Sequence, residues 1–467
     1  MKISMFKNYN SIKNEVKASI WVCYILAILP VFTIILDCIF KIFNVTNLSF
    51  LHLYSQYTYL LILFPIIFIL VDIIAVLCGK RRLRFNFKEF ILSYLEIIPL
   101  AMCFLLIITS SIVQIIQDSS LNGFTTDVSS PYHLATGFPI ILLIAMCFLF
   151  GFGIKNRNIA THILFAIVIC SSILCILILI DPKCDLFFHN PSNTNWSSVF
   201  CNSNYFGLYL TISILLLAGL FCFSTKTMRW LSFVALLLHL FVLFLVNTFS
   251  SMLAVFIALI TLFILQNVRL KKFSFLSLLP LFAFVAISLI VQLFAQSYYS
   301  KYIGFFAEIK QLAIDIKNIF TDYNSTLADN AGTGRFKLFK ESIKQILDHP
   351  LLGNGNTYTN PHSAFLQLAE IWGLPCLTLL IISFIMSTIR FFKHFKSQSS
   401  LSIITFIAIE GFLICSLFCS IMPHITPLFL MIFGVFVRYY NIDIKKNKLQ
   451  KTIKTDGIII TDQNVLN

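Results

Sequence analysis

Residues 204–246 read NYFGLYLTISILLLAGLFCFSTKTMRWLSFVALLLHLFVLFLV. This stretch holds two apolar runs, 204–223 and 231–246, and the polar segment between them carries Lys226 and Arg229. A run of about 20 apolar residues is long enough to cross the hydrocarbon core of a bilayer as a helix. The residues do not alternate between polar and apolar, as they do in the strands of a membrane barrel. Because a spanning segment must satisfy its own backbone hydrogen bonds, the stretch predicts two membrane helices joined by a short basic loop.

The same pattern continues along the whole 467-residue chain, of which 58% is hydrophobic and 12% is charged. A soluble domain carries about twice that charged fraction. We therefore predict an all-α, polytopic integral membrane protein with about 12 transmembrane helices and one large, partly helical external loop. The predicted spans are 18–40, 57–78, 91–116, 137–154, 161–181, 204–223, 231–246, 252–265, 273–295, 364–389, 401–421 and 427–440. They divide the chain into an N-terminal bundle of about nine helices at 1–295, the external loop at 296–362, C-terminal helices at 363–440 and a tail at 441–467.

The distribution of basic residues predicts the orientation of these spans. The N-terminal segment, alternate loops and the C-terminal tail together hold 25 of the 34 Lys and Arg residues, whereas the opposite loops hold 8. The positive-inside rule makes the richer side cytoplasmic, so both termini are expected in the cytoplasm. The formal charge of +14 is therefore a topology signal, and no nucleic-acid partner is expected.

The 13 cysteines do not indicate a redox protein, because 11 lie within or at the ends of the apolar spans. There Cys behaves as a small hydrophobic residue. Cys184 and Cys201 fall in a predicted external loop, where they are either joined in a disulfide or present as two free thiols.

The external segment 296–362 has a helical pattern of its own. Apolar residues recur at helical spacing over 302–320 and again over 335–347. The first helix would lie on the membrane interface or cap the bundle, and Thr333 or Gly334 would cap the second. A glycine-rich turn at 353–356 ends the unit, and His362 follows at the mouth of the next span.

Arg335 stands out among the basic residues of this segment, because it opens the second helix. Lys337, Lys340 and Lys344 need no more than lipid phosphates or nearby carboxylates as partners. A cation beside the unpaired N–H groups of a helix start is unfavourable, and a bound anion would remove that conflict. Since the guanidinium fork suits phosphate oxygens, we predict that Arg335 binds a diphosphate.

His362 is the candidate proton acceptor or hydrogen-bond donor, because an imidazole can exchange protons near neutral pH. An interfacial polar residue without a catalytic role is the alternative. Glu370 follows by two helical turns, so both side chains could face one cavity. Five acidic residues lie inside predicted spans: Asp37, Asp72, Glu96, Glu370 and Glu410. A charged residue inside a membrane span is costly and often functional, so a proton-coupled transporter is the rival interpretation of these five residues.

Three stretches, 332–335, 349–355 and 362–373, together resemble the signature of the O-antigen ligase and polysaccharide polymerase family. That signature consists of a helix led by Arg, a turn of the form hPllG.G, and a span start of the form HN..Lq...e.G. Residues 202–207 resemble the "N.N..g" feature of the same family. Two positions depart from the pattern: Ser251 replaces the arginine of an "SR" pair, and Ser363 replaces the asparagine after His362.

The resemblance implies a glycosyltransferase of the GT-C-like membrane architecture in the bacterial cytoplasmic membrane, acting at its outer face on a glycan carried by undecaprenyl diphosphate. It also implies that no metal or other cofactor takes part, and the external loops hold no acidic cluster spaced for Mg²⁺ or Mn²⁺. The implied roles are diphosphate binding by Arg335, Lys337, Lys340 and Lys183, catalysis by His362, Arg335 and Glu370, and glycan contacts from Asn202, Asn204 and Asn360.

Two activities of the family fit these motifs. A polymerase extends a lipid-linked O-antigen, capsule or exopolysaccharide chain, whereas an O-antigen ligase moves the finished chain to another acceptor. We predict a polymerase, because the sequence shows no second acceptor-binding domain. Its partners would be a lipid-linked oligosaccharide, a glycan acceptor, membrane lipids and a chain-length regulator. A flippase or transporter of lipid-linked sugars is the third possibility, and it would predict inverted repeats and broken spans, neither of which is visible.

Overall fold

The computed structural model describes residues 17–42, 67, 94–117, 138–184, 196–200, 202–298, 304–355, 361–421 and 425–456. Every regular element within these ranges is a helix. The bundle helices are α1 (Lys17–Ile42), α4 (Ile97–Gln117), α6 (Phe138–Gly153), α7 (Arg157–Ile180), α8 (Ser203–Phe223), α9 (Lys226–Val246), α10 (Phe249–Leu270), α11 (Phe275–Tyr298), α16 (Leu374–Lys393), α17 (Ser400–Ser416) and α18 (Thr426–Asp456). The remaining helices are α12 (Phe305–Thr321), α13 (Thr326–Asp329), α14 (Arg335–Asp348) and α15 (Ala364–Trp372).

Seven of these helices are long and apolar enough to cross a membrane, namely α7 to α11, α16 and α18. Shorter apolar stretches lie in α1, α4 and α17. The prediction of an all-α, polytopic membrane protein is therefore confirmed. The predicted span 57–78 falls outside the described ranges, apart from the single residue Ile67.

Helix α8 lies at the centre of the bundle, and 18 of its side chains, from Tyr205 to Cys222, are buried. An apolar surface on every side of a helix is typical of one that is surrounded by other helices. It packs against α9, α10 and α17. Gly207 lets α10 approach closely, because a Cβ there would lie 2.2 Å from Thr248 Oγ1. Small residues at helix contacts are the usual way in which membrane helices pack.

Two acidic residues inside predicted spans have structural partners. Glu96 is buried, and its carboxylate accepts hydrogen bonds from Arg390 Nη1 at 2.7 Å and Asn441 Nδ2 at 2.6 Å, so it joins α4, α16 and α18. Glu410 accepts a hydrogen bond from Thr261 Oγ1 at 2.8 Å. Asp72 and the side chain of Asp37 lie outside the described part of the chain.

The predicted span 364–389 is not one helix, so the expectation that no span is broken was wrong. It divides at Gly373 into α15 and α16. Gly373 has a φ of +88°, and a Cβ there would lie 2.2 Å from the backbone oxygen of Leu351. The turn at 349–353 therefore packs directly into the break. At the C-terminal end, α18 continues to Asp456, past the predicted start of the tail at 441.

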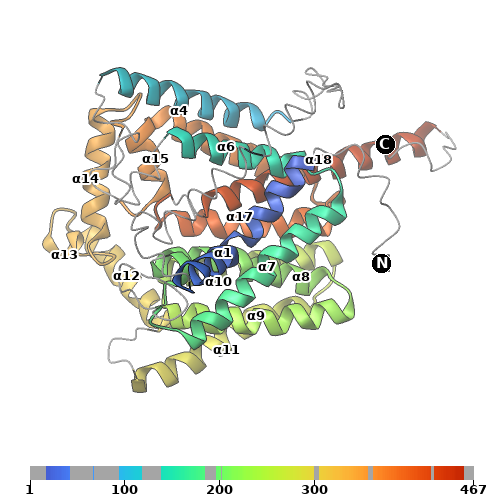
Figure 1. Cartoon of the computed structure of the whole chain (residues 1–467), viewed down its shortest axis with the longest axis horizontal. Helices are drawn as coiled ribbons and strands as arrows, with labels where there is room; N and C mark the ends of the chain where they lie inside the picture. Colours follow the sequence, from blue (N-terminus) through green and yellow to red (C-terminus); the bar gives the residue numbers. More distant parts are fainter. Residues whose placement is uncertain are drawn as a thin grey trace.

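Helices α12, α13 and α14, residues 305–348, form a cover along one edge of the bundle, and α14 crosses the direction of most bundle helices (Figure 1). The two predicted amphipathic helices correspond to α12 and α14, while α13 lies in the polar stretch between them, where no helix was predicted. Phe305 anchors the start of α12, because its buried ring contacts Phe249, Phe256 and Phe284 of α10 and α11. The other end of the cover packs on α15.

Candidate functional site

The turn that leads into α14 has an unusual backbone. Gly332, Thr333 and Gly334 all have positive φ, at 59°, 60° and 85°. Asp315 of α12 fixes the turn, because its Oδ2 accepts a hydrogen bond from Gly332 N at 2.8 Å. Gly334 is the N-cap of α14, which decides between the two residues that the sequence offered. The hydrogen bond from the turn to Asp315 of α12 thus helps to fix the direction of α14.

Arg335 is half-buried at the first position of α14. The N-cap has no side chain, and the first turn of the helix holds no acidic residue. Among the described residues, none forms a hydrogen bond or ion pair with the Arg335 guanidinium. The conflict between this cation and the positive end of the helix therefore persists, and an anion bound there would relieve it.

Two titratable groups outside the spans lie within electrostatic reach of Arg335. Burial lowers the pKa of His362, and the positive charge of Arg335 lowers it further. Burial raises the pKa of Glu308 in α12, the carboxylate of Asp315 adds to that rise, and Arg335 opposes it. His362 is consequently neutral at neutral pH and can accept a proton. Glu308 was not predicted from the sequence; the structure places it in the first turn of α12, which begins at Phe305.

The three lysines of α14 differ in their surroundings. Lys337 and Lys344 are exposed. Lys340 is held by its neighbours: Nζ lies 2.7 Å from Asp329 Oδ1, 2.9 Å from the backbone oxygen of Tyr323, and 4.6 Å from the centre of the Tyr323 ring. Lys340 thus ties α13 to α14. We assign it to the folding of the cover, which leaves Lys337 as the lysine that could assist Arg335.

Glu370 links the cover to the bundle. Its side chain is fully buried in α15, and Oε2 accepts a hydrogen bond from Ser342 Oγ of α14 at 2.8 Å. Its backbone oxygen accepts a hydrogen bond from Asn354 N at 2.9 Å. Gly353 packs against the same helix, because a Cβ there would lie 2.3 Å from the backbone of Ile371. The turn 349–355 and α15 therefore form one packed unit below α14.

His362 lies on the turn just before α15, with a φ of +48°. The expectation that it shares a cavity with Glu370 stays a prediction, and neither residue lines the apolar cavity that lies between α15 and helices α4, α16, α17 and α18. That cavity meets the face of α15 that carries Phe365, Leu368 and Trp372. Glu370 Oε2 instead accepts the hydrogen bond from Ser342 of α14, so this contact joins two helices.

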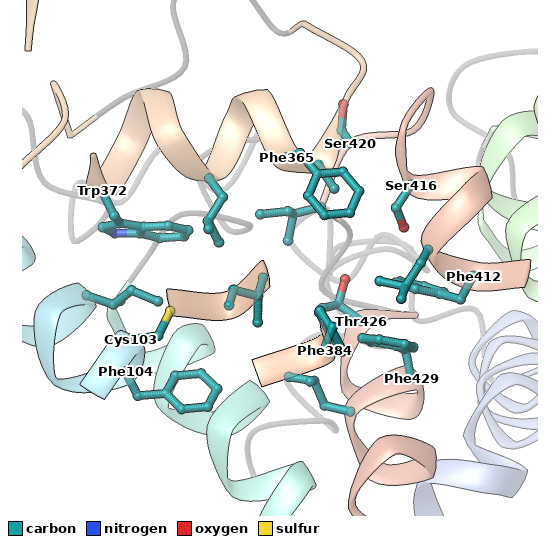
Figure 2. A pocket seen from close by; sticks show the side chains of 17 residues that line it. Cys103, Phe104, Phe365, Trp372, Phe384, Phe412, Ser416, Ser420, Thr426 and Phe429 are labelled. Carbon is teal, nitrogen blue, oxygen red and sulfur yellow. The ribbon is translucent and has the colours of Figure 1, made fainter. Parts of the chain in front are cut away.

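The cavity beside α15 has a volume of about 90 Å³ and opens outward between α4, α15, α16, α17 and α18, with about 780 Å³ of empty space when the open mouth is included. Figure 2 shows aromatic rings around it, with hydroxyl groups on one side. Within the described ranges, the buried Trp372 Nε1 and Ser416 Oγ have no hydrogen-bond partner. The labelled lining residues are Cys103, Phe104, Phe365, Trp372, Phe384, Phe412, Ser416, Ser420, Thr426 and Phe429. Such a lining suits a long apolar group with a few polar atoms.

The sequence analysis included Gln367 in the 362–373 motif but predicted no role for it. It is fully buried in α15, and its Oε1 accepts a hydrogen bond from Ile421 N at 2.6 Å. Its Nε2 is buried without a partner in the described structure. Gln367 thus connects α15 to the segment after α17, close to the cavity.

The remaining predicted residues lie elsewhere or have other roles. Asn202 is the N-cap of α8, and its Oδ1 accepts a hydrogen bond from Asn204 N at 2.8 Å, so this part of the "N.N..g" feature stabilises a helix start. Asn204 is half-buried in the first turn of α8. Lys183 is exposed on the turn after α7 and has no ion pair within the described residues. Asn360 lies outside the described ranges.

Ser251, at the position of the family's arginine, is fully buried, and its Oγ lies 3.4 Å from Cys415 Sγ of α17. This position therefore faces a neighbouring helix and does not replace the missing cation. Cys184 is a buried free thiol, and Ser197 Oγ donates a hydrogen bond to its Sγ at 3.7 Å. Cys201 lies outside the described ranges. No group of three His, Cys, Asp or Glu side chains suited to a metal ion occurs among the residues that the structure describes.

The fold defines a polytopic membrane protein. Its candidate site combines Arg335 at the start of α14 with a titratable histidine just before α15, and α15 itself lines an apolar cavity. Residues 232–381 match the family model described as O-antigen ligase. The match covers α14, the 349–355 turn and α15, so the resemblance drawn from the motifs is confirmed. It supports a glycan-handling function, with lipid-linked glycans and membrane lipids as the implied partners. No curated protein matches the chain.

Proposed function

We propose that the chain is a polysaccharide polymerase that transfers glycan repeat units from undecaprenyl diphosphate to a growing chain. The observation that carries the proposal is Arg335, a half-buried cation without a protein partner in the described residues, at the N-terminus of α14 and within electrostatic reach of His362. A diphosphate would satisfy both the guanidinium and the helix N-terminus.

The donor would use both parts of the site. An apolar part of its polyprenyl chain suits the cavity lined by α15, and its diphosphate suits Arg335, with Lys337 two residues further along α14. His362 and the cavity-lining helix α15 are close in the chain, because α15 begins at Ala364, two residues after His362. Lys340 is left out, since Asp329 and Tyr323 already hold its ammonium.

The reaction needs one proton acceptor and one stabilised leaving group. His362, neutral because its pKa is lowered, would take the proton from the acceptor hydroxyl. The hydroxyl oxygen would then attack the anomeric carbon, and the bond from that carbon to the diphosphate oxygen would break. Arg335 would stabilise the charge that develops on the departing diphosphate, so this proposal assigns that role to a side chain and not to a metal ion.

A ligase is the second candidate, and the description of the matching family favours it. We prefer the polymerase because the cover, residues 305–348, is small, and no separate acceptor-binding domain is present among the described residues. The break at Gly373 is the observation that favours a transporter. In transporters such breaks expose backbone groups to a substrate, whereas here Leu374 N donates a hydrogen bond to Pro350 O at 2.8 Å and the turn fills the gap.

The distribution of Lys and Arg supports a site on the outer face of the cytoplasmic membrane, with both termini in the cytoplasm. Lipid-linked repeat units become available on that face after export, so chain growth there is chemically reasonable. A polymerase whose products have a defined length also needs a chain-length regulator, which would be its protein partner.

The test uses Arg335→Ala and His362→Ala in the native host, with the surface glycan separated on a gel. Lys344→Ala is the matched control, because Lys344 is an exposed cation on the same helix. If the chain is a polymerase, the surface glycan of both site variants should lose its ladder of lengths, while single repeat units remain. Loss of attachment, with long lipid-linked chains still present, would identify a ligase. An unchanged ladder, with both variants present in the membrane, would refute the site.

A further inference from the structure

A second pocket lies at the end of the bundle away from the cover. It is formed where α8 and α10 end and where α9 and α11 begin, and it holds about 820 Å³ of empty space including its open mouth. The start of α10 packs on Phe305 of the cover, so the C-terminal end of α10 lies at the far side. The lining residues include Phe223, Arg229, Gln266, Arg269, Lys272 and Ser274.

Three of these lining residues are cations, and none of them forms an ion pair with a carboxylate among the described residues. Asp443 of α18 is near enough to act on the charge of Arg269. Its own carboxylate is already engaged, because Oδ1 lies 2.7 Å from Arg157 Nη2 and Oδ2 accepts hydrogen bonds from Ser399 N and Ser402 Oγ. The pocket therefore keeps an excess of positive charge.

The arginines are held in place by neighbouring groups that carry no charge. Arg229 donates from Nε to Phe221 O at 3.1 Å and from Nη2 to Ser224 O at 3.2 Å, at the end of α8. Arg269 lies with its guanidinium 5.2 Å from the centre of the Phe223 ring. Positioned cations of this kind suit an anion with several oxygen atoms.

Gln266 supplies an independent sign of a ligand. It lines the pocket and is only 6% exposed, yet its Oε1 is buried without a hydrogen-bond partner in the described structure. Leaving a buried acceptor unpaired costs about 1–3 kcal/mol, so a ligand that donates a hydrogen bond is favoured. A phosphate diester offers no donor, which indicates that the ligand also carries a hydroxyl or amine.

The surroundings indicate that this pocket lies at the level of the lipid headgroups. Trp230, next to Arg229 in the chain, is 48% exposed and Phe273, next to Lys272, is 61% exposed, as expected for aromatic residues at a membrane interface. Along α9, Leu231 and Val234 follow with exposures of 60% and 66%, and form an apolar surface for acyl chains. Basic pockets between membrane helices are known to suit anionic headgroups.

We propose that this pocket binds an anionic phospholipid with a hydroxyl-bearing headgroup, such as phosphatidylglycerol. Its phosphate lies among Arg229, Arg269 and Lys272, and a headgroup hydroxyl donates to Gln266 Oε1. The site is separate from the proposed catalytic site and does not depend on the reaction assigned there.

The test uses the full chain purified in a neutral detergent and titrated with short-chain phosphatidylglycerol, with the melting temperature as the readout of binding. The charge variant is R269Q/K272Q, because both side chains are exposed and lie in the pocket. The control is K226Q/K271Q, which removes two exposed cations from the same loops without touching the lining. One basic side chain contributes about a factor of five to binding an anionic lipid, so R269Q/K272Q should bind about 25-fold more weakly, and the control about as well as wild type.

A second variant, Gln266→Leu, tests the hydroxyl contact. It should weaken binding of phosphatidylglycerol but leave binding of phosphatidylmethanol, an anionic diester without a headgroup hydroxyl, unchanged. Phosphatidylcholine and inorganic phosphate should not raise the melting temperature. Equal binding by R269Q/K272Q and its control, or stabilisation by inorganic phosphate as large as that by the lipid, would overturn the proposal.

Discussion

Replacing Gly353 by alanine should destabilise the protein far more than replacing Gly334, although both glycines have positive φ, at 70° and 85°. An L-residue in the left-handed region costs about 1–2 kcal/mol, and this applies to both variants. The difference lies in the surroundings. A Cβ at Gly334 meets no atom within 4 Å, whereas a Cβ at Gly353 would lie 2.3 Å from the backbone of Ile371.

The backbone of α15 cannot rotate away as a side chain would, so the 349–355 turn must separate from it. Separation breaks the hydrogen bonds from Asn354 N to Glu370 O and from Gly355 N to Ile371 O, at 2.9 and 3.2 Å. Each contributes about 1 kcal/mol net. With the conformational term of about 1–2 kcal/mol, the loss for Gly353→Ala comes to about 3–4 kcal/mol, against about 1–2 kcal/mol for Gly334→Ala.

Chemical denaturation of the purified protein in detergent would measure both losses. Gly353→Ala should also reduce glycan transfer, because α15 begins beside His362 and its position depends on the turn. Equal loss of stability in the two variants would refute the reasoning, since it would show that the contact with Ile371 contributes nothing. A fully stable Gly353→Ala protein would refute the geometry of the turn itself.

Two further predictions concern the groups around Arg335. Because burial and Arg335 both lower the pKa of His362, its imidazole should stay neutral and react with diethyl pyrocarbonate at pH values below its ordinary pKa of about 6.5. Arg335→Gln removes one of the two causes, so the midpoint of labelling, followed by mass spectrometry, should move to higher pH; an unchanged midpoint would contradict the proximity of the two residues. Ser342→Ala removes a hydrogen bond to the buried Glu370 side chain and should lower the free energy of unfolding by about 1–3 kcal/mol. A loss near zero would show that this contact does not hold the cover on the bundle.

Periodicity was sufficient to predict the two main helices of the cover, because each has one apolar face and one charged face. It did not predict the break at Gly373, because the apolar pattern runs through it. The signal that could have shown the break is Pro375, which lies in the first turn of α16, directly after Gly373 and Leu374. The break depends on the turn at 349–353, whose backbone occupies the space beside Gly373. This is a contact between segments, and hydropathy along the chain does not report it.

The candidate site shows the same limit. The sequence distinguishes Arg335, which opens α14, but gives no reason to treat Lys337 and Lys340 differently as phosphate ligands. The structure separates them through Asp329 and Tyr323, which lie in a stretch without a clear pattern and engage only Lys340. The pairing of Glu370 with Ser342, and not with His362, likewise follows from the packing of α15 on α14.

Reconstituted transfer is the most direct test of the claim that Arg335 and His362 act on a lipid-linked glycan. The purified chain in liposomes, supplied with undecaprenyl-diphosphate-linked repeat units, should lengthen the glycan and release one undecaprenyl diphosphate for each new linkage. Removing a group that stabilises developing charge typically lowers turnover about 100- to 1,000-fold, so Arg335→Ala should fall by that factor while Lys344→Ala keeps the wild-type rate. Wild-type turnover by a folded Arg335→Ala protein would contradict the account.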